Sequence, residues 1–157
     1  MTDRAAAPTP ATLRARLADI VALLERFPMA VLQLLFRISI AAVFWNSGLT
    51  KIASWQSTVV LFRDEYHVPL LPPEIVATLA ATVELTCPVL LVLGLATRLA
   101  TLPMLGMTFV IEAFVYPEDW IEHLTWASLL LFILTRGAGP ISLDRWLAPR
   151  LLDRRVP

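Results

Sequence analysis

Four ionisable residues lie inside long apolar runs of the sequence: Arg37, Glu84, Glu112 and His123. A charge near the centre of a membrane-spanning helix costs about 2.5–3.5 kcal/mol on insertion scales, so such residues usually pair with one another or serve a function. Arg37 and Glu84 both fall near the middle of their runs, which predicts an ion pair between them. In the alternative interpretation, these two charges only fix the register and pairing of the helices.

Glu112 and His123 lie nearer the outer ends of their runs, at the level of Asn46, Lys51 and Trp126. A histidine and a carboxylate can exchange protons near neutral pH. We therefore expect a polar pocket that opens outward and binds a ligand or handles protons. The candidate ligand-binding residues are Arg37, Lys51, Glu84, Glu112, His123 and Trp126. The catalytic residues are unknown because the sequence has no self-contained catalytic motif, so an enzymatic role stays open.

Cysteine and histidine usage limits the redox chemistry that the chain itself could perform. Its one cysteine, Cys87, lies in an apolar run and allows no disulfide framework, no Cys-x-x-Cys pair and no cysteine-ligated cluster. The two histidines, His67 and His123, have no known metal-ligand spacing with the nearby carboxylates. Both also map to the outer side, which argues against a bis-histidine haem. We expect no metal site and no intrinsic cofactor.

The elements that position these residues are those of a membrane protein. Hydrophobic residues make up 57% of the 157-residue chain and charged residues 17%, with a mean hydropathy of +0.69, which a soluble domain of this size could not bury. Four apolar runs, 29–49, 74–95, 99–116 and 121–135, approach the length of roughly 20 residues that a membrane span needs. They predict an all-α integral membrane four-helix bundle over residues 29–136. A stripe of polar and small residues should face its interior in the first span: Gln33, Arg37, Ala41, Gly48 and Lys51.

Shorter helices are expected outside the four spans. Residues 1–28 form a cytoplasmic tail whose apolar positions predict an amphipathic helix on the membrane surface, or else a surface helix packed on a partner. A periplasmic interfacial helix is predicted in the long connection after the first span, where Trp55, Val59, Phe62 and Tyr66 share a helical face. Residues 137–157 form a cytoplasmic segment in which Ser142 can cap a short interfacial helix.

The distribution of basic residues predicts the orientation of the bundle. Only Lys51 and Arg63 lie on one side, whereas ten arginines lie on the other: Arg4, Arg14, Arg16, Arg26, Arg98, Arg136, Arg145, Arg150, Arg154 and Arg155. By the positive-inside rule, both ends of the chain are cytoplasmic in a bacterial inner (plasma) membrane. No cleavable signal peptide is visible, so we expect the first span to be retained. The zero formal net charge gives no indication of a nucleic-acid partner.

These features resemble those of the DoxX family of four-helix bacterial membrane proteins. The resemblance covers roughly residues 37–152 and rests on Arg37 with Gly48-Leu49-Thr50-Lys51, on Glu84 with Gly94 and Thr97-Arg98, and most specifically on the segment Gly137-Ala138-Gly139-Pro140-Ile141-Ser142-Leu143-Asp144. The string from Glu65 to Pro73 is similar to a proteobacterial subgroup of that family. The resemblance implies the fold and the topology more firmly than an activity.

The family resemblance implies two functional hypotheses. Its namesake relatives are small membrane subunits of quinone-linked sulfur oxidation, and others associate with redox-stress partners, so the first hypothesis is an accessory membrane subunit of a redox system that binds quinone. The proteobacterial subgroup resembles components encoded beside enzymes that modify metal-binding peptides. The second hypothesis is therefore a membrane component for export, maturation or handling of such a peptide or a small solute. Both imply contact with the lipid bilayer and a protein partner, and leave an oligomer possible; a purely structural scaffold is a third interpretation.

Overall fold

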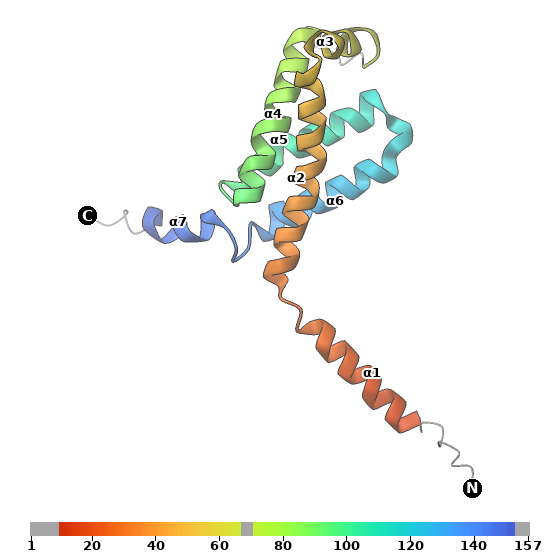
Figure 1. Ribbon diagram of the computed structural model, residues 1–157, viewed down its shortest axis with the longest axis vertical. Helices are drawn as coiled ribbons and strands as arrows, with labels where there is room; N and C mark the ends of the chain where they lie inside the picture. Colours follow the sequence, from red (N-terminus) through yellow and green to blue (C-terminus); the bar gives the residue numbers. More distant parts are fainter. Residues whose placement is uncertain (1–9, 67–70, 153–157) are drawn as a thin grey trace.

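Every regular element in the described parts of the chain, residues 10–66 and 71–152 of the computed structural model, is a helix (Figure 1). In chain order the helices are α1 (Pro10–Glu25), α2 (Met29–Ala53), α3 (Trp55–Asp64), α4 (Pro73–Leu93), α5 (Thr97–Val110), η1 (Ile111–Val115), η2 (Pro117–Asp119), α6 (Trp120–Arg136) and α7 (Leu143–Leu152). Of the two short elements, η1 is a π-helical turn and η2 a 3₁₀ turn. The expected all-α membrane bundle is confirmed.

Three helices are long and apolar enough to cross a membrane: α2, α4 and the continuous segment Thr97–Val115 made by α5 and η1. They agree with the first three predicted spans. The fourth, α6, has 17 residues, which is about 25 Å of helix at 1.5 Å per residue, against a hydrocarbon layer of about 30 Å. It packs against α5 as the second arm of a helical hairpin (Figure 1). That α6 itself crosses the membrane stays a prediction.

The centre of the bundle is the close packing of α2 on α4. The predicted interior stripe is confirmed, because Gln33, Arg37, Ala41 and Gly48 are all buried. At Gly48 a Cβ atom would lie only 2.9 Å from the side chain of Leu85, so a glycine is needed for the two helices to approach this closely. The core beside this contact contains Ile40, Phe44, Leu91, Met104, Leu130 and Ile133.

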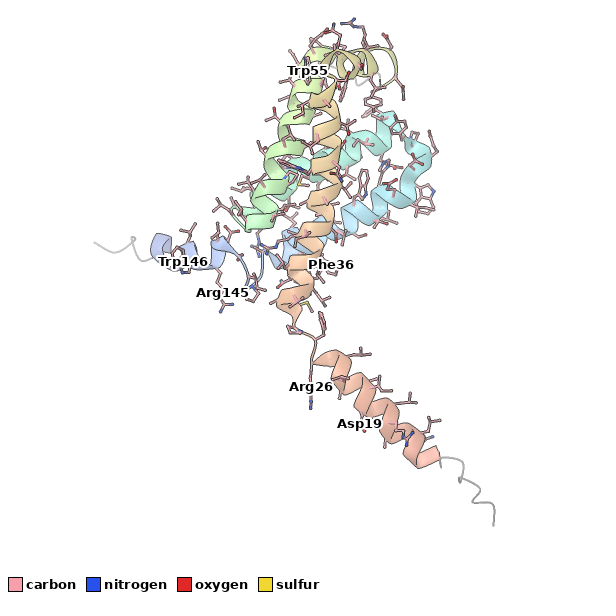
Figure 2. The ribbon with its side chains drawn as sticks, viewed as in Figure 1. Asp19, Arg26, Phe36, Trp55, Arg145 and Trp146 are labelled. Atoms are coloured by element: carbon pink, nitrogen blue, oxygen red, sulfur yellow. The ribbon has the colours of Figure 1, made fainter. Side chains whose placement is uncertain are left out.

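The peripheral helices lie at the two ends of the bundle. The predicted outer helix, α3, lies across one end (Figure 1) and buries Phe62 against Ala77 and Ala80 of α4. At the other end, α1 projects away from the bundle with exposed side chains such as Asp19, and α7 carries Trp146 on its surface (Figure 2). The predicted helices on either side of the spans are therefore present, and α1 and α7 share one end of the molecule.

The first turn of α7 is fastened to the turn between α4 and α5. The carboxylate of Asp144 accepts hydrogen bonds from the backbone N–H of Ala96 at 2.7 Å and of Thr97 at 3.0 Å, and so caps the start of α5. The Asp144 N–H in turn donates to the carbonyl of Gly94 at 2.8 Å. Ser142 accepts a hydrogen bond from the N–H of Arg145 at 3.4 Å, the capping contact expected from the sequence. The distinctive segment 137–144 therefore holds the end of the bundle that bears α1 and α7.

Candidate functional site

A cavity of about 420 Å³ lies among α2, α3, α4, α6 and the outer part of the α5–η1 helix. Most of its wall is apolar, and its polar groups come from separate helices. Lys51, Glu84, His123 and Trp126 all line it, so four of the six candidate residues meet at one place. The other lining residues are Ser47, Phe62, Tyr66, Val76, Leu79, Ala80, Val83, Met107, Val110, Ile111, Val115, Tyr116, Asp119 and Glu122.

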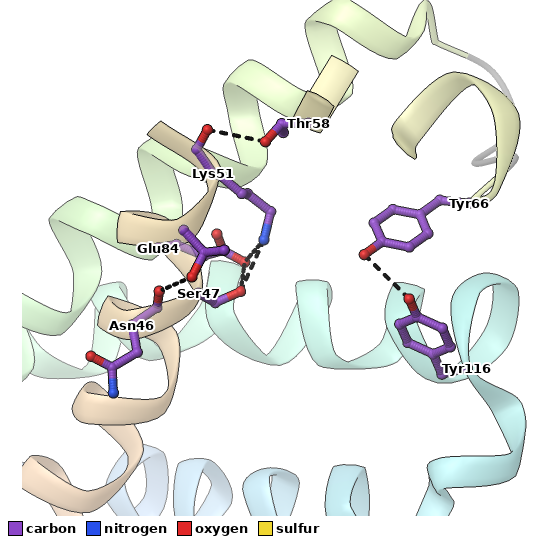
Figure 3. Close-up of polar contacts among 8 residues, drawn as sticks. Asn46, Ser47, Lys51, Thr58, Tyr66, Glu84 and Tyr116 are labelled. Carbon is purple, nitrogen blue, oxygen red and sulfur yellow. Dashed lines mark hydrogen bonds and ion pairs between the residues drawn. The ribbon is translucent and has the colours of Figure 1, made fainter. Parts of the chain in front are cut away.

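A buried ion pair forms one wall of the cavity. Nζ of Lys51 lies 2.7 Å from Oε1 of Glu84, and the two side chains are only 15% and 3% exposed (Figure 3). Ser47 joins them: its hydroxyl donates to Glu84 at 3.1 Å and accepts from Lys51 at 2.9 Å. The second carboxylate oxygen of Glu84, Oε2, is buried and has no hydrogen-bond partner among the described residues. The acid is thus neutralised by the lysine but keeps one unused acceptor.

The predicted ion pair between Arg37 and Glu84 is wrong. Arg37 is buried and donates from Nη2 to the carbonyl of Ile141, in the segment before α7. It lies ten residues before Ser47, or about 15 Å lower along the helix, and so cannot reach Glu84. The prediction failed because Arg37 and Glu84 were each assigned to the middle of the membrane from their positions in separate runs. In the structure α2 and α4 are aligned along their axes so that Ser47 and Lys51, one turn beyond it, lie within reach of Glu84.

Glu112 and His123 contact each other, as the pocket hypothesis expected. Nδ1 of His123 lies 2.7 Å from Oε2 of Glu112, with the histidine side chain 5% exposed and the glutamate 36%. His123 also packs edge-on against Trp126, at 5.2 Å between ring centroids, and Trp126 leans on Phe44 at 5.8 Å. Because Nδ1 of His123 is engaged by Glu112, the ring nitrogen left for a molecule in the cavity is Nε2, which has no hydrogen-bond partner among the described residues.

Glu112 itself lies outside the wall of the main cavity. It lines a neighbouring groove between α5 and α6, and His123 borders both spaces. Glu112 sits on the π-helical turn η1, a widened turn that is often found at functional sites in α-helices. The histidine therefore connects the cavity with a carboxylate on the outer surface of the helical hairpin.

Two tyrosines, which the sequence analysis did not assign to the pocket, complete the wall near α3. The hydroxyl of Tyr116 donates to the carboxylate of Glu65 at 2.9 Å. It also lies 3.4 Å from the hydroxyl of Tyr66 (Figure 3). Tyr116 follows the spanning segment directly. Its hydrogen bond with Tyr66, its partial burial and its bond to Glu65 raise the pKa of the phenol above its ordinary value, so it stays protonated at neutral pH. The sequence analysis expected Tyr66 on the outer helix, but α3 ends at Asp64 and Tyr66 lies two residues beyond it. The signal that could have found Tyr66 was its helical spacing from Phe62, against which its ring packs.

Asn46 does not belong to the pocket. Its side chain is exposed on α2, and Figure 3 shows its amide pointing away from Lys51 and from the two tyrosines. The second histidine, His67, lies outside the described residues. Within the described ranges, no group of three or more histidine, cysteine, aspartate or glutamate residues could hold a metal ion.

The arrangement of groups favours a small molecule with an apolar body and polar atoms at its edge. Lys51 offers a cationic N–H donor, His123 offers a ring nitrogen, and the tyrosines offer hydroxyl groups, all around an apolar chamber. The volume falls in the range of roughly 300–1,000 Å³ that is usual for ligand pockets. Of the two other candidate residues, Glu112 reaches this cluster only through His123, and Arg37 lies away from it.

Comparison with known proteins agrees with this architecture. The search of curated proteins and the search of solved structures each returned no match. The DoxX family model matches residues 32–117, more than half of the chain, and includes Arg37, Lys51, Glu84 and Glu112. The match stops before His123 and before the segment 137–144, and it indicates no subgroup. The chain belongs to the DoxX family.

Proposed function

We propose that this protein is an accessory membrane subunit whose cavity binds the headgroup of a quinone for an associated oxidoreductase. The observation that carries the proposal is that Lys51 and His123 both line one apolar cavity of about 420 Å³. A quinone ring is flat and apolar and bears two carbonyl oxygens, so it needs hydrogen-bond donors at its edges and an apolar wall along its faces and tail.

Lys51 supports this proposal because its ammonium group has one donor to spare. The group carries three N–H donors, of which two are used by Glu84 and Ser47. The third is available to a carbonyl oxygen. Glu84 fixes the direction of the lysine, and the apolar surroundings strengthen any hydrogen bond that the charge makes.

His123 supports the proposal through its contact with Glu112. Reduction of a quinone to a quinol takes up two electrons and two protons, and oxidation releases them. A histidine with Nε2 available to the cavity and Nδ1 bonded to a carboxylate at 2.7 Å can carry protons between a bound ring and the groove that contains Glu112. The electrons would come from or go to the partner, because the sequence contains no motif for a flavin or an iron–sulfur cluster.

The proposal includes a location and an orientation. The protein resides in a bacterial inner membrane, with α1 and α7 on the cytoplasmic side and α3 on the periplasmic side. The ten arginines on the side of the two chain ends support this orientation. The cavity then lies in the outer half of the membrane, and its ligand arrives from the outer leaflet or from the periplasm.

A second candidate function is the handling of a cationic solute or a metal-binding peptide. Asp119 and Glu122, which line the cavity, favour it, because exposed carboxylates near the entrance attract cations. The double variant Asp119→Asn/Glu122→Gln removes both charges and keeps the size of both side chains. The double variant should weaken the handling of a cationic solute or a metal-binding peptide. It should leave the binding of a neutral quinone ring unchanged.

The quinone content of the purified protein tests the first proposal. Protein is isolated from bacterial membranes in nanodiscs, and quinone in the lipid extract is measured by mass spectrometry against nanodiscs without protein. We expect enrichment in the native chain and in the control variant Leu102→Ala, whose residue is 51% exposed on α5, and a loss of enrichment in His123→Phe. Equal quinone content in protein-containing and empty nanodiscs would reject the proposal.

A further inference from the structure

Asn46 places an amide on the outside of the bundle at the depth of its buried charges. The neighbouring residue, Ser47, bonds to Glu84, and Glu84 lies near the middle of the 21-residue helix α4. Asn46, in the outer half of α2, is therefore at about the depth of the middle of α4. Its side chain is exposed and points away from the cavity (Figure 3).

The amide of Asn46 has no hydrogen-bond partner among the described residues. Its backbone carbonyl accepts from the hydroxyl of Thr50 at 2.9 Å, but no contact of the side-chain amide accompanies it. The hydrocarbon layer contains no water to satisfy the amide, so an exposed asparagine at this depth is unfavourable for a single chain in lipid. A partner with a matching polar group at the same depth would remove that cost.

An apolar groove lies beside Asn46. It has a volume of about 340 Å³ and is lined by Ile38, Ala42 and Trp45 of α2 together with Val89 and Val92 of α4. The groove is on a different face of α2 from Lys51, so a partner seated there would leave the cavity accessible.

We infer that this face of α2 and α4 binds a second copy of the chain, with Asn46 of each copy hydrogen-bonded to Asn46 of the other. Two copies inserted in the same orientation are related by a two-fold axis along the membrane normal. Equivalent residues of the two copies then lie at the same depth in the membrane. Asparagine is suited to such self-contact because its amide both donates and accepts. Hydrogen bonds between polar side chains are a common source of helix association in membranes.

The groove fits the same symmetric arrangement. In a two-fold interface, the groove and the side chain that fills it belong to the same surface. Trp45 is partly exposed at the edge of the groove. The Trp45 side chain of each copy can therefore enter the groove of the other copy. Ala42 presents little side chain and lets the two α2 helices approach.

Cross-linking in native membranes tests the inference. The Ala42→Cys variant, which keeps Asn46 and places the thiol in the groove, is treated with a short bis-maleimide, and Phe109→Cys on the exposed face of α5 is the matched control. The native Cys87 is buried and serves as the background. We expect a covalent dimer with Ala42→Cys only. Equal cross-linking of the two variants, or a cross-link of Ala42→Cys to a different protein without self-dimer, would overturn the inference.

A second measurement uses substitutions that leave the monomer intact, since Asn46 is exposed. The dissociation constant of the dimer is measured in lipid by single-molecule photobleaching. We expect Asn46→Leu to raise it roughly 5- to 30-fold, as for the loss of interhelical hydrogen bonds in membranes, and Asn46→Gln to stay near the native value. A monomeric native protein, or an unchanged constant in Asn46→Leu, would overturn the inference. Neither result depends on quinone binding.

Discussion

Lys51 and Glu84 meet across the packed faces of α2 and α4, with Nζ 2.7 Å from Oε1, and together they form a charged wall in an otherwise apolar cavity. Ser47 binds both partners, so the lysine is held in one direction. This contact both joins the two central helices and presents a donor to the cavity. The same two residues therefore have both a structural role and a ligand-binding role. Different variants are needed to distinguish the two roles.

Removal of the lysine should destabilise the fold more than removal of the whole pair. Lys51→Met leaves the Glu84 carboxylate buried without a counter-ion, which we expect to lower the free energy of unfolding by about 3 kcal/mol. The double variant Lys51→Met/Glu84→Gln contains no buried charge and should recover most of that loss. Thermal unfolding in detergent measures both. A double variant no more stable than Lys51→Met would contradict the ion-pair account.

Gly94 should tolerate no side chain. It has φ of +68°, and a Cβ atom there would overlap the Arg37 guanidinium and Ser142. We expect Gly94→Ala to cost about 1–3 kcal/mol from the backbone conformation alone, with more from the displaced arginine. Gly106→Ala is the control, because nothing lies within 4 Å of its Cβ; as a helix-interior change it should stabilise by about 0.5–1 kcal/mol. Unfolding of both variants is compared in the same detergent, and equal effects would argue against the packing described at Gly94.

Asp144 should hold α7 to the bundle. The Asp144→Ala variant loses the bonds to the N–H groups of Ala96 and Thr97, which we expect to cost about 1–2 kcal/mol, as for other helix caps. Hydrogen exchange at those two amides should accelerate by roughly tenfold, in line with a loss of that size. Asp19→Ala on the exposed helix α1 should leave both amides unchanged. Unaltered exchange in Asp144→Ala would show that the cap is not made in the membrane.

Much of the architecture could be predicted because it follows from patterns of burial. Apolar runs predicted the three helices that are long and apolar enough to cross a membrane, and the small-residue stripe placed Gln33, Arg37 and Ala41 in the interior. The contact of Glu112 with His123 could also be anticipated, because both residues lie near the outer turn between adjacent helices.

The partners of the other charges could not be predicted, because they depend on features that leave no periodic signal. The choice of Lys51 over Arg37 as the partner of Glu84 depends on where α2 ends and on how α2 and α4 are aligned along their axes. The π-helical turn at Glu112 is a local change in hydrogen bonding that the apolar run through residues 99–116 did not predict. Asn46 and Ser47 point in directions about 100° apart around the helix. This difference determines whether the side chain faces lipid or the cavity, and an estimate of depth along the helix does not contain it.

The orientation of the bundle can be measured with single cysteines. Glu118→Cys lies in the turn before α6, and Arg145→Cys lies on α7 at the other end. In intact cells a membrane-impermeant maleimide should label Glu118→Cys at once and Arg145→Cys only after permeabilisation. Labelling in the reverse order would place the chain ends outside and contradict the proposed topology.

The most direct test of the central claim is equilibrium binding of a short-tailed benzoquinone to the purified protein in nanodiscs. The account predicts saturable binding to the native chain and a dissociation constant raised roughly tenfold or more in both His123→Phe and Lys51→Met/Glu84→Gln, since each loses a hydrogen bond in an apolar site. The control variant Leu102→Ala should bind as the native chain does. Binding that does not saturate, or equal dissociation constants in all four proteins, would contradict the claim that the cavity between Lys51 and His123 holds a quinone.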